Sequence, residues 1–309
     1  MEKVPILVGP TAVGKTEVAL SVAQKLPVEI VSADSRQIYR YLNIGTAKPT
    51  RNQLAQVKHH LIDFLRPDEY FSAGMFSRIG RKIINQILAK QKIPLVVGGS
   101  GLYISALVDG FFRLEIRDDK VRNSLRKRVL NEGVDVLYKE LTTIDPAAAE
   151  KISVKDKQRI IRALEVFLVT GQKLSQLQET QSTPADFESV FYGLTAERNF
   201  LYDKINQRVN QMINKGLLSE IAGLKRKGFS PKLNALNTVG YKEVFAYMEN
   251  ALSYDEMLET IKRNTRHYAK RQITWFKRDK RIKWFMIGEN TDIPGLTDKI
   301  ISDFNSKKD

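Results

Sequence analysis

Cysteine is absent from this sequence of 309 residues, and histidine occurs only at His59, His60 and His267. The lack of cysteine excludes disulfide bonds, zinc–thiolate sites and cysteine nucleophiles. The three histidines do not have the spacing of a metal-binding motif, and none can be placed in a Ser–His pair. Covalent catalysis by cysteine and metal binding through a histidine motif are therefore excluded.

Long hydrophobic runs are also missing. No apolar segment approaches the ~18 residues that a transmembrane helix needs. The first residues lack the charged-then-apolar pattern of a secretory signal and lead straight into a strand. We therefore expect a cytoplasmic protein without a membrane partner. Because no interface pattern is readable, a monomer is the default expectation.

Acidic residues are scarce relative to basic ones. Lysine and arginine together number 50, against 35 aspartates and glutamates, for a net charge of +15. Such an excess attracts polyanions, of which nucleic acid is the commonest. A basic enzyme with small acidic substrates would show the same imbalance, so charge favours a nucleic-acid partner without requiring one.

Short buried strands alternate with helices in the first hundred residues. We expect strands at 4–8, 28–32 and 94–97, and helices at 17–25, 51–60 and 73–90. This alternation predicts an α/β fold, with a parallel sheet and helices on both faces.

The pattern changes near residue 117. From there to about 181 only helices are expected, at 119–131, 134–144, 146–151 and 157–170, and 175–188 is typical of a polar loop. A strand at 189–194 follows, then helices at 201–215, 217–227, 240–248 and 254–277, and a last strand at 283–287. The sequence thus predicts an α/β core of residues 1–116 and 189–309, with a basic helical C-terminal part, and an all-helical insertion domain at 117–188.

The first strand leads into a phosphate-binding motif. It fits the pattern G-x-x-x-x-G-K-[ST] and lies between a strand and a helix, the context that supports such a match. Loop N–H groups and the positive end of the helix attract an anion, Lys15 adds a charge at the terminal phosphate, and Thr16 offers a hydroxyl to Mg²⁺. The motif predicts a diphosphate-type ligand but does not specify ATP. This phosphate loop comprises Gly9, Pro10, Thr11, Ala12, Val13, Gly14, Lys15 and Thr16.

An ordinary ATPase is disfavoured, because such enzymes usually hold Mg²⁺ with an aspartate at the end of a buried strand. Here the strand at 94–97 ends in two glycines followed by Ser100 and another glycine. The nearest acid is Asp34, after the second strand. Ligands of α/β sheets bind beyond the carboxyl ends of the strands, so we expect the phosphate loop, Asp34 and Ser100 to converge. Asp34 is then a candidate general base, and a turn or helix cap is the structural alternative.

Several further segments, in order along nearly the whole chain, resemble those of the tRNA dimethylallyltransferases, the IPP transferase family. Besides the phosphate loop they are residues 32–39, 44–49, 59–63, 98–103, 159–165, 239–243 and 268–276. One departure is Ser100, where the family more often has threonine, but the hydroxyl is kept.

The resemblance implies an enzyme that transfers a dimethylallyl group from dimethylallyl diphosphate to N6 of adenine 37, in the anticodon loop of tRNA, and releases diphosphate. It implies that Asp34 takes the N6 proton. It also implies that Lys15, Thr16 and Arg208 bind the diphosphate, with Mg²⁺ as a bridging ion. The resemblance further implies a P-loop NTPase-like core, with the helical insertion closing over RNA. The implied tRNA contacts are Asp34, Ser35, Arg36, Gln37, Ser100, Asn123, Gln158, Arg159, Ile160, Ile161, Arg162, Val239, Gly240, Tyr241 and Lys242.

Residues 262–283 carry ten lysines and arginines and a single acid, with aromatic side chains between them. The cations can bind phosphates and the aromatics can stack on splayed bases. The alternative is an amphipathic helix whose aromatics face the core. We expect both, with the aromatics mostly in the core.

Three other functions are considered. A prenyltransferase that uses a free adenine mononucleotide would not need the basic surface or the insertion. A P-loop small-molecule kinase would be expected to have the strand-end acid that is missing here. An RNA-binding protein with a vestigial loop would not need Gly14, Lys15 and Thr16 intact.

Overall fold

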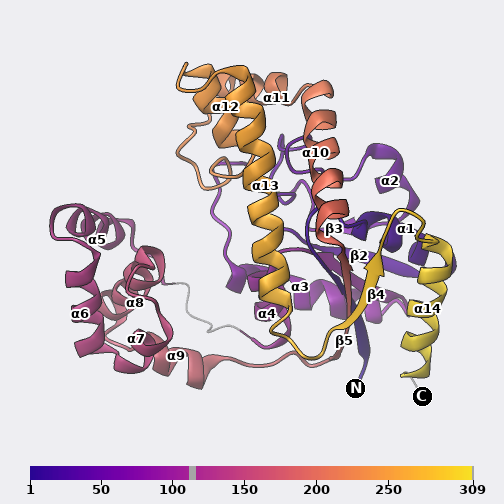
Figure 1. The fold of residues 1–309 in the computed structure, drawn as a ribbon. Helices are drawn as coiled ribbons and strands as arrows, with labels where there is room; N and C mark the ends of the chain where they lie inside the picture. Colours follow the sequence, from indigo (N-terminus) through magenta and orange to yellow (C-terminus); the bar gives the residue numbers. More distant parts are fainter. Residues whose placement is uncertain (111–115, 308–309) are drawn as a thin grey trace. The chain divides into compact units, whose positions relative to one another are not determined.

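The computed structural model describes residues 1–110 and 116–307. The chain forms two compact units: a core unit of Met1–Val108 and Ala185–Asp309, and a helical unit of Asp109–Pro184 (Figure 1). The expected insertion began later, at 117, and ended at 188. The two segments of the core unit meet where the Ala185 amide donates a hydrogen bond to the Val108 carbonyl at 2.8 Å.

A six-stranded parallel sheet forms the centre of the core unit. Its strands are β1 (Lys3–Val8), β2 (Val28–Ala33), β3 (His59–His60), β4 (Ile93–Gly98), β5 (Glu188–Ala196) and β6 (Lys283–Ile287). The order is β3-β2-β4-β1-β5-β6, and every pairing is parallel. Nearly every residue of β1, β2 and β4 is buried, as expected for strands covered on both faces. The expected α/β fold is confirmed.

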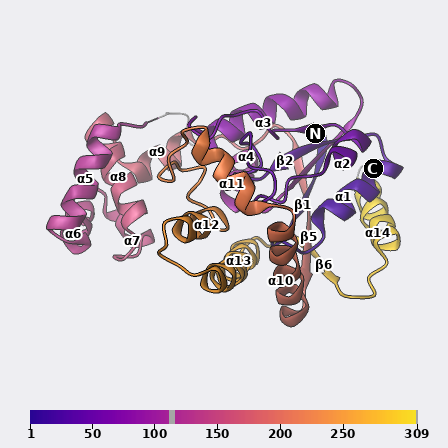
Figure 2. The same cartoon turned by 90° about the horizontal axis from the view of Figure 1, so that it is seen from above.

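Helices cover both faces of this sheet. On one face lie α1 (Lys15–Lys25) and α14 (Ile293–Ser306), and on the other α3 (Ala73–Leu88) and α4 (Gly101–Val108) (Figure 2). Leu7, Ile30 and Leu95 belong to the core cluster that includes α1 and α14. Because side chains alternate along a strand, the neighbouring Ile6 and Val96, which are fully buried, point to the opposite face.

Five further helices complete the core unit: α2 (Arg51–Gln56), α10 (Arg198–Asn214), α11 (Leu217–Arg226), α12 (Tyr241–Met248) and α13 (Tyr254–Phe276). The longest, α13, packs along α10 and α12 and touches α4. Among the described residues, no helix is long and apolar enough to cross a membrane.

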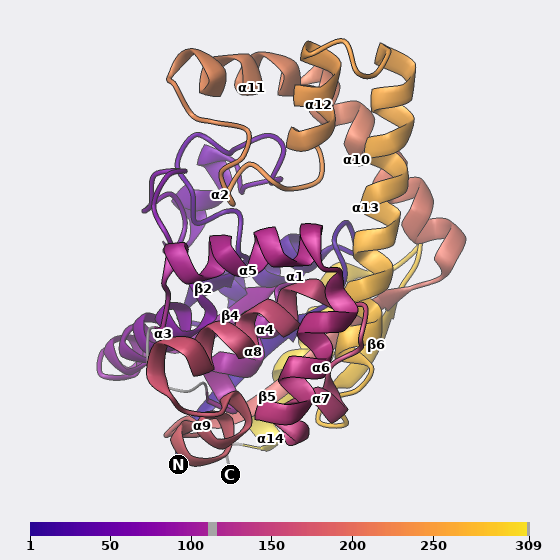
Figure 3. The same ribbon diagram turned by 90° about the vertical axis from the view of Figure 1, so that its left-hand side faces the viewer.

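The helical unit consists of α5 (Asp119–Asn131), α6 (Val134–Ile144), α7 (Pro146–Lys151), α8 (Lys157–Thr170) and α9 (Leu174–Gln181) (Figure 3). Aspartates at 118, 145 and 156 cap α5, α7 and α8, which explains why the sequence predicts these starts correctly. The unit has its own core, which includes Leu137, Leu141 and Leu164.

Two local predictions are wrong, and two helices were not predicted. Part of the expected loop at 175–188 is helix α9, whose Leu174 and Leu177 are buried in a largely polar segment. The expected helix at 51–60 ends at Gln56, and residues 59–60 form the short edge strand β3. Helix α4 was not expected because its sequence is almost uniformly apolar and lacks helical periodicity. Helix α14 was also missed.

The approach of β4 to β2 depends on Gly98. A β-carbon at this position would lie 2.2 Å from the Ala33 carbonyl oxygen, so a side chain would force the two strand ends apart. We predict that Gly98→Ala destabilises the protein by about 1–3 kcal/mol and lowers the melting temperature by several degrees.

The matched control is Gly223→Ala on α11, where the nearest side-chain atom would lie 3.9 Å from the new β-carbon. This change should leave the melting temperature unchanged or raise it slightly. Equal effects of the two substitutions in thermal unfolding would contradict the packing argument.

Candidate active site

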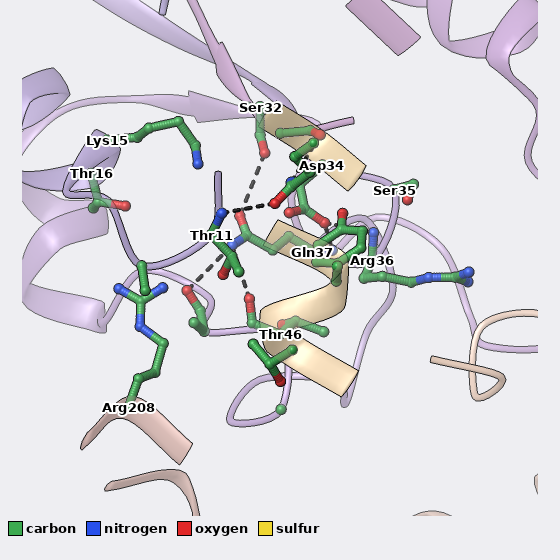
Figure 4. A pocket seen from close by; sticks show the side chains of 18 of the residues that line it. Thr11, Lys15, Thr16, Ser32, Asp34, Ser35, Arg36, Gln37, Thr46 and Arg208 are labelled. Carbon is green, nitrogen blue, oxygen red and sulfur yellow. Dashed lines mark hydrogen bonds between the residues drawn. The ribbon is translucent and has the colours of Figure 1, made fainter. Parts of the chain in front are cut away.

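A cavity of about 400 Å³ opens at the carboxyl ends of β1, β2 and β4 (Figure 4). All the residues that line it belong to the core unit. Parallel strands end at the same edge of the sheet, which is why segments far apart in sequence meet here. The lining includes residues 11–16, 34–37, 45–47 and 97–99, together with Arg208, Asn237, Thr238, Val239, Lys242, Thr265, Tyr268, Arg271 and Gln272.

The phosphate loop connects β1 to α1. Gly14, immediately before the helix, has a φ of 104°, a left-handed conformation that suits glycine. The Lys15 ammonium group donates hydrogen bonds to the carbonyl oxygens of Gly9 at 2.9 Å and Pro10 at 2.7 Å. Burial, with a smaller contribution from the charge of Arg208, lowers the pKa of Lys15 to about 8. The loop thus holds a cation in surroundings that do not solvate it well.

Arg208 reaches the same cavity from α10 (Figure 4). Burial lowers the pKa of its guanidinium group, and the main opposing influence is the charge of Glu17. Two partly desolvated cations, Lys15 and Arg208, therefore lie near loop amides and a helix N-terminus. An anion would relieve their mutual repulsion, so this end of the cavity is suited to a phosphate group.

Asp34 directly follows β2 and faces the cavity. One carboxylate oxygen, Oδ1, accepts the backbone N–H groups of Arg36 at 2.8 Å and Gln37 at 3.2 Å. The turn-capping role foreseen as the structural alternative is thus present. The other oxygen, Oδ2, has no hydrogen-bond partner among the described residues, so one carboxylate can both support the turn and accept a proton.

The other expected residues of this turn have defined places as well. Ser35 donates its backbone N–H to the Ser100 hydroxyl at 3.0 Å. Arg36 donates to the Asn234 carbonyl at 2.6 Å, and the Gln37 amide donates to the carbonyls of Thr46 and Ala47. Ser35, Arg36 and Gln37 line the cavity. Ser100 is not part of the lining and supports the turn through its hydrogen bond with Ser35.

The segment at 239–242 is divided between the cavity and the core. Val239 and Lys242 line the cavity, but Tyr241 is fully buried and donates its hydroxyl to Glu220 at 2.6 Å. The Gly240 amide donates to Glu243. The Tyr241 side chain is therefore unavailable to RNA and acts as a support for the wall of the cavity.

The remaining expected tRNA contacts lie in the helical unit. Asn123, Gln158 and Arg159 are exposed, and Arg159 pairs with Asp156 at 3.3 Å. Ile160 and Ile161 are buried in the core of this unit, so their side chains are unavailable to RNA. Burial of these two positions follows from the helical spacing of α8, in which residues 160, 163, 164 and 166 are fully or almost fully buried.

The Arg162 side chain binds Glu165. Their side chains form an ion pair at 3.0 Å, and Arg122 reaches the same carboxylate at 2.7 Å. Glu165 is fully buried and also accepts the backbone N–H of Asp118. The Arg162 side chain, which the resemblance implied as a tRNA contact, is therefore engaged in an ion pair within the helical unit.

The basic C-terminal segment also has a mixed role. Phe276 is buried, Trp275 is 37% exposed, and Tyr268 lines the cavity with Arg271, whose guanidinium lies 5.9 Å from the Tyr268 ring centre. Several cations have partners within the protein, for example Arg266 with Asn206 at 2.8 Å.

Gln272 was not singled out from the sequence. Its side chain is buried, and its amide oxygen accepts the backbone N–H of Thr11 at 2.8 Å. The only sequence signal was its place within residues 268–276, where the resemblance is strong. A glutamine in an amphipathic basic helix otherwise reads as a solvated residue.

A parallel sheet whose central strand leads into a phosphate loop defines the chain as a P-loop-like α/β protein. A model of the family described as IPP transferase matches residues 37–279. The chain belongs to this family.

Curated relatives agree along almost the full length. A tRNA dimethylallyltransferase of Thermotoga neapolitana is 47% identical over 283 residues, which cover 92% of each chain. A tRNA dimethylallyltransferase of Carboxydothermus hydrogenoformans is 44% identical over 98% of this chain and 97% of its own.

Solved structures are similar too. The full-length tRNA isopentenylpyrophosphate transferase of Bacillus halodurans superposes with a TM-score of 0.73 at 37% identity, over 100% of this chain and 98% of that chain. A eukaryotic dimethylallyltransferase acting on tRNA gives 0.83 at 27% identity, over 99% of this chain and 80% of that one.

The lowered pKa of Lys15 predicts a pH-dependent stability. Its pKa is about 8 in the folded protein and 10.5 ordinarily, so between these values the unfolded chain binds more protons and stability rises with pH. Lys15→Met removes this contribution. Between pH 7 and about pH 9.5 the stability of the wild type relative to Lys15→Met should increase by about 1–2 kcal/mol, measured by chemical unfolding. A constant difference would mean that Lys15 has an ordinary pKa.

Proposed function

We propose that this protein transfers a dimethylallyl group from dimethylallyl diphosphate to N6 of adenine 37 in the anticodon loop of tRNA, with release of diphosphate. The observation that carries the proposal is the composition of one cavity. A phosphate loop with two partly desolvated cations, Lys15 and Arg208, faces the carboxylate of Asp34 across it. The names of the relatives supply the donor and the acceptor class.

The two halves of the cavity suit the two halves of the reaction. The adenine amino group is a weak nucleophile because its lone pair is delocalised into the ring, so proton removal during attack helps. Asp34 Oδ2 is available for that proton. Negative charge grows on the departing diphosphate, where the loop amides, Lys15 and Arg208 stabilise it.

Magnesium fits this site as a partner of the diphosphate. In the described ranges, no group of three or more His, Cys, Asp or Glu side chains could hold a metal ion. Where a phosphate loop holds Mg²⁺, the ion binds to the substrate phosphates and to the hydroxyl that follows the loop lysine, so Thr16 would be its ligand from this loop. The ion would neutralise charge on the diphosphate.

An RNA acceptor agrees with the charge and with the cavity. The net charge of +15 favours a polyanion over a mononucleotide. A base in a loop must turn out of its stack to enter a pocket, which costs a few kcal/mol and least for an unpaired base. Asp34, Arg36 and Lys242 line the cavity that would receive it. We propose that the protein works as a monomer in the cytoplasm.

The alternative functions make different use of the loop. In a small-molecule kinase the loop would hold ATP and an acid would follow β4, but β4 ends in Gly98 and continues with Gly99. A prenyltransferase of free mononucleotides would share the donor and differ only in the acceptor.

One parallel incubation tests these three functions. The purified protein, Mg²⁺ and dimethylallyl diphosphate are combined with unmodified tRNA, with AMP, or with ATP in place of the donor, and nucleoside masses and released phosphates are measured. We expect a dimethylallyl mass gain on tRNA adenine alone. A gain on AMP would favour the mononucleotide enzyme, and ATP turnover without prenylation would contradict the proposal.

Replacement of Asp34 tests the proposed base. Asp34→Ala should reduce turnover by roughly 10²–10⁴-fold with tRNA binding retained. Asp34→Asn keeps an oxygen for the N–H groups of Arg36 and Gln37, so it separates loss of the base from loss of the turn. Comparable losses in both variants are expected in single-turnover assays. Full activity of Asp34→Asn would remove Asp34 from proton transfer.

A further inference from the structure

One face of α13 lies against the loops that form the cavity. Tyr268 and Gln272 are four residues apart, so they project from the same face of the helix. The Tyr268 side chain lies beside the Ser100 hydroxyl, which accepts the backbone N–H of Ser35. Gln272 contacts the phosphate loop. This helix face thus reaches the loops that follow β1, β2 and β4.

Gln272 bridges two of these loops with a single side chain. Its Oε1 accepts the Thr11 N–H at 2.8 Å, and its Nε2 donates to the Gly99 carbonyl at 2.9 Å. Thr11 belongs to the phosphate loop after β1, and Gly99 follows β4. Gln272 is 6% exposed, so both hydrogen bonds are largely shielded from water. Replacing Gln272 with an apolar residue would therefore leave the Thr11 N–H and the Gly99 carbonyl without this partner.

The glycines of the β4 loop leave room for this contact. A β-carbon at Gly99 would lie 2.1 Å from Gln272 Nε2, and one at Gly101 would lie 2.2 Å from Trp275 Cδ1. A larger residue at Gly99 would displace the Gln272 amide group, and one at Gly101 would displace the Trp275 ring. The close approach of helix and loop, and with it the position of Gln272, is therefore built into the sequence at 99–101.

We propose that Gln272 is a positioning residue that fixes the phosphate loop relative to the β4 loop, and thereby relative to the Asp34 turn that Ser100 supports. It acts through the Thr11 amide and the Gly99 carbonyl. The proposal rests on the diphosphate site of the proposed function and adds a residue to it. Loops at strand ends are the mobile part of an α/β site, so a bridge between them lowers the cost of ordering the loop around the anion.

The test uses Gln272→Leu, which is similar in size but makes neither hydrogen bond. Binding of inorganic diphosphate with Mg²⁺ is measured by calorimetry, followed by kcat and KM for the donor and the dissociation constant for tRNA. We expect diphosphate to bind about 10-fold more weakly and kcat to fall, with the affinity for tRNA unchanged. Gln211→Leu, at an exposed position on α10 outside the cavity lining, is the control and should behave as the wild type.

Gln272→Glu separates positioning from a general loss of packing. The ionised side chain keeps an acceptor for Thr11 but opposes the Gly99 carbonyl, whereas the protonated acid can donate to it. Burial beside the loop raises the pKa of this carboxyl above its ordinary value, so the diphosphate affinity of Gln272→Glu, taken relative to that of the wild type at the same pH, should recover as the pH falls from 8 to about 5.5. If Gln272→Leu fails to fold, this pH profile decides.

Wild-type diphosphate affinity in Gln272→Leu, or in Gln272→Glu at every pH, would overturn the inference. Because diphosphate binding is measured without tRNA or donor, failure of the positioning role can be distinguished from failure of the proposed function. No binding of diphosphate to the wild type would contradict the proposed function itself, whereas binding that is insensitive to residue 272 would contradict only the positioning role.

Discussion

The burial of two cations in one cavity is the constraint around which the site is organised. Lys15 and Arg208 lie in the same cavity, and burial lowers the pKa of both. Lys15 donates to two loop carbonyls; besides burial, the charge of Arg208 lowers its pKa, and the charges of Asp34 and Glu17 raise it. Such an arrangement costs free energy until an anion enters, and stored unfavourable energy of this kind is common at functional sites. It suits the cavity to the anion binding and the leaving-group stabilisation that we propose.

The parallel sheet determines what lies opposite these cations. The carboxyl ends of β1, β2 and β4 are neighbours, and each continues into a loop that contributes to the cavity. Asp34 is fixed there by its own turn, and Ser100 supports that turn from the next strand. Helix α13 packs against this edge, and Gln272 forms hydrogen bonds with both the phosphate loop and the β4 loop. The proposed base, the proposed anion site and helix α13 are therefore parts of one packed arrangement.

Much of this arrangement could be predicted from the sequence because it depends on local patterns. The phosphate loop has a fixed spacing, the buried strands are continuous apolar runs, and capping aspartates mark the helices of the helical unit. Asp34 was found because it directly follows a strand, in a fold where strand ends converge. The family resemblance, rather than the residues themselves, pointed to Arg208.

What the sequence did not reveal depends on tertiary packing. The resemblance covered Ile160 and Tyr241, but it did not show that one is buried in a helical core and the other is bound to Glu220. Gln272 is a polar residue in a basic helix, and its partners are 261 and 173 residues away along the chain. No local pattern encodes contacts over such distances.

The most direct test of the account is a crystal structure of the protein with Mg²⁺ and a thiolo analogue of dimethylallyl diphosphate that reacts slowly. The account predicts that the diphosphate lies against the amides of residues 12–16, that the Lys15 ammonium group leaves the carbonyls of Gly9 and Pro10 to bind it, and that Arg208 contacts it. The dimethylallyl group should lie on the side of Asp34. A diphosphate bound away from the phosphate loop, or Lys15 still bound to the loop carbonyls, would contradict the account.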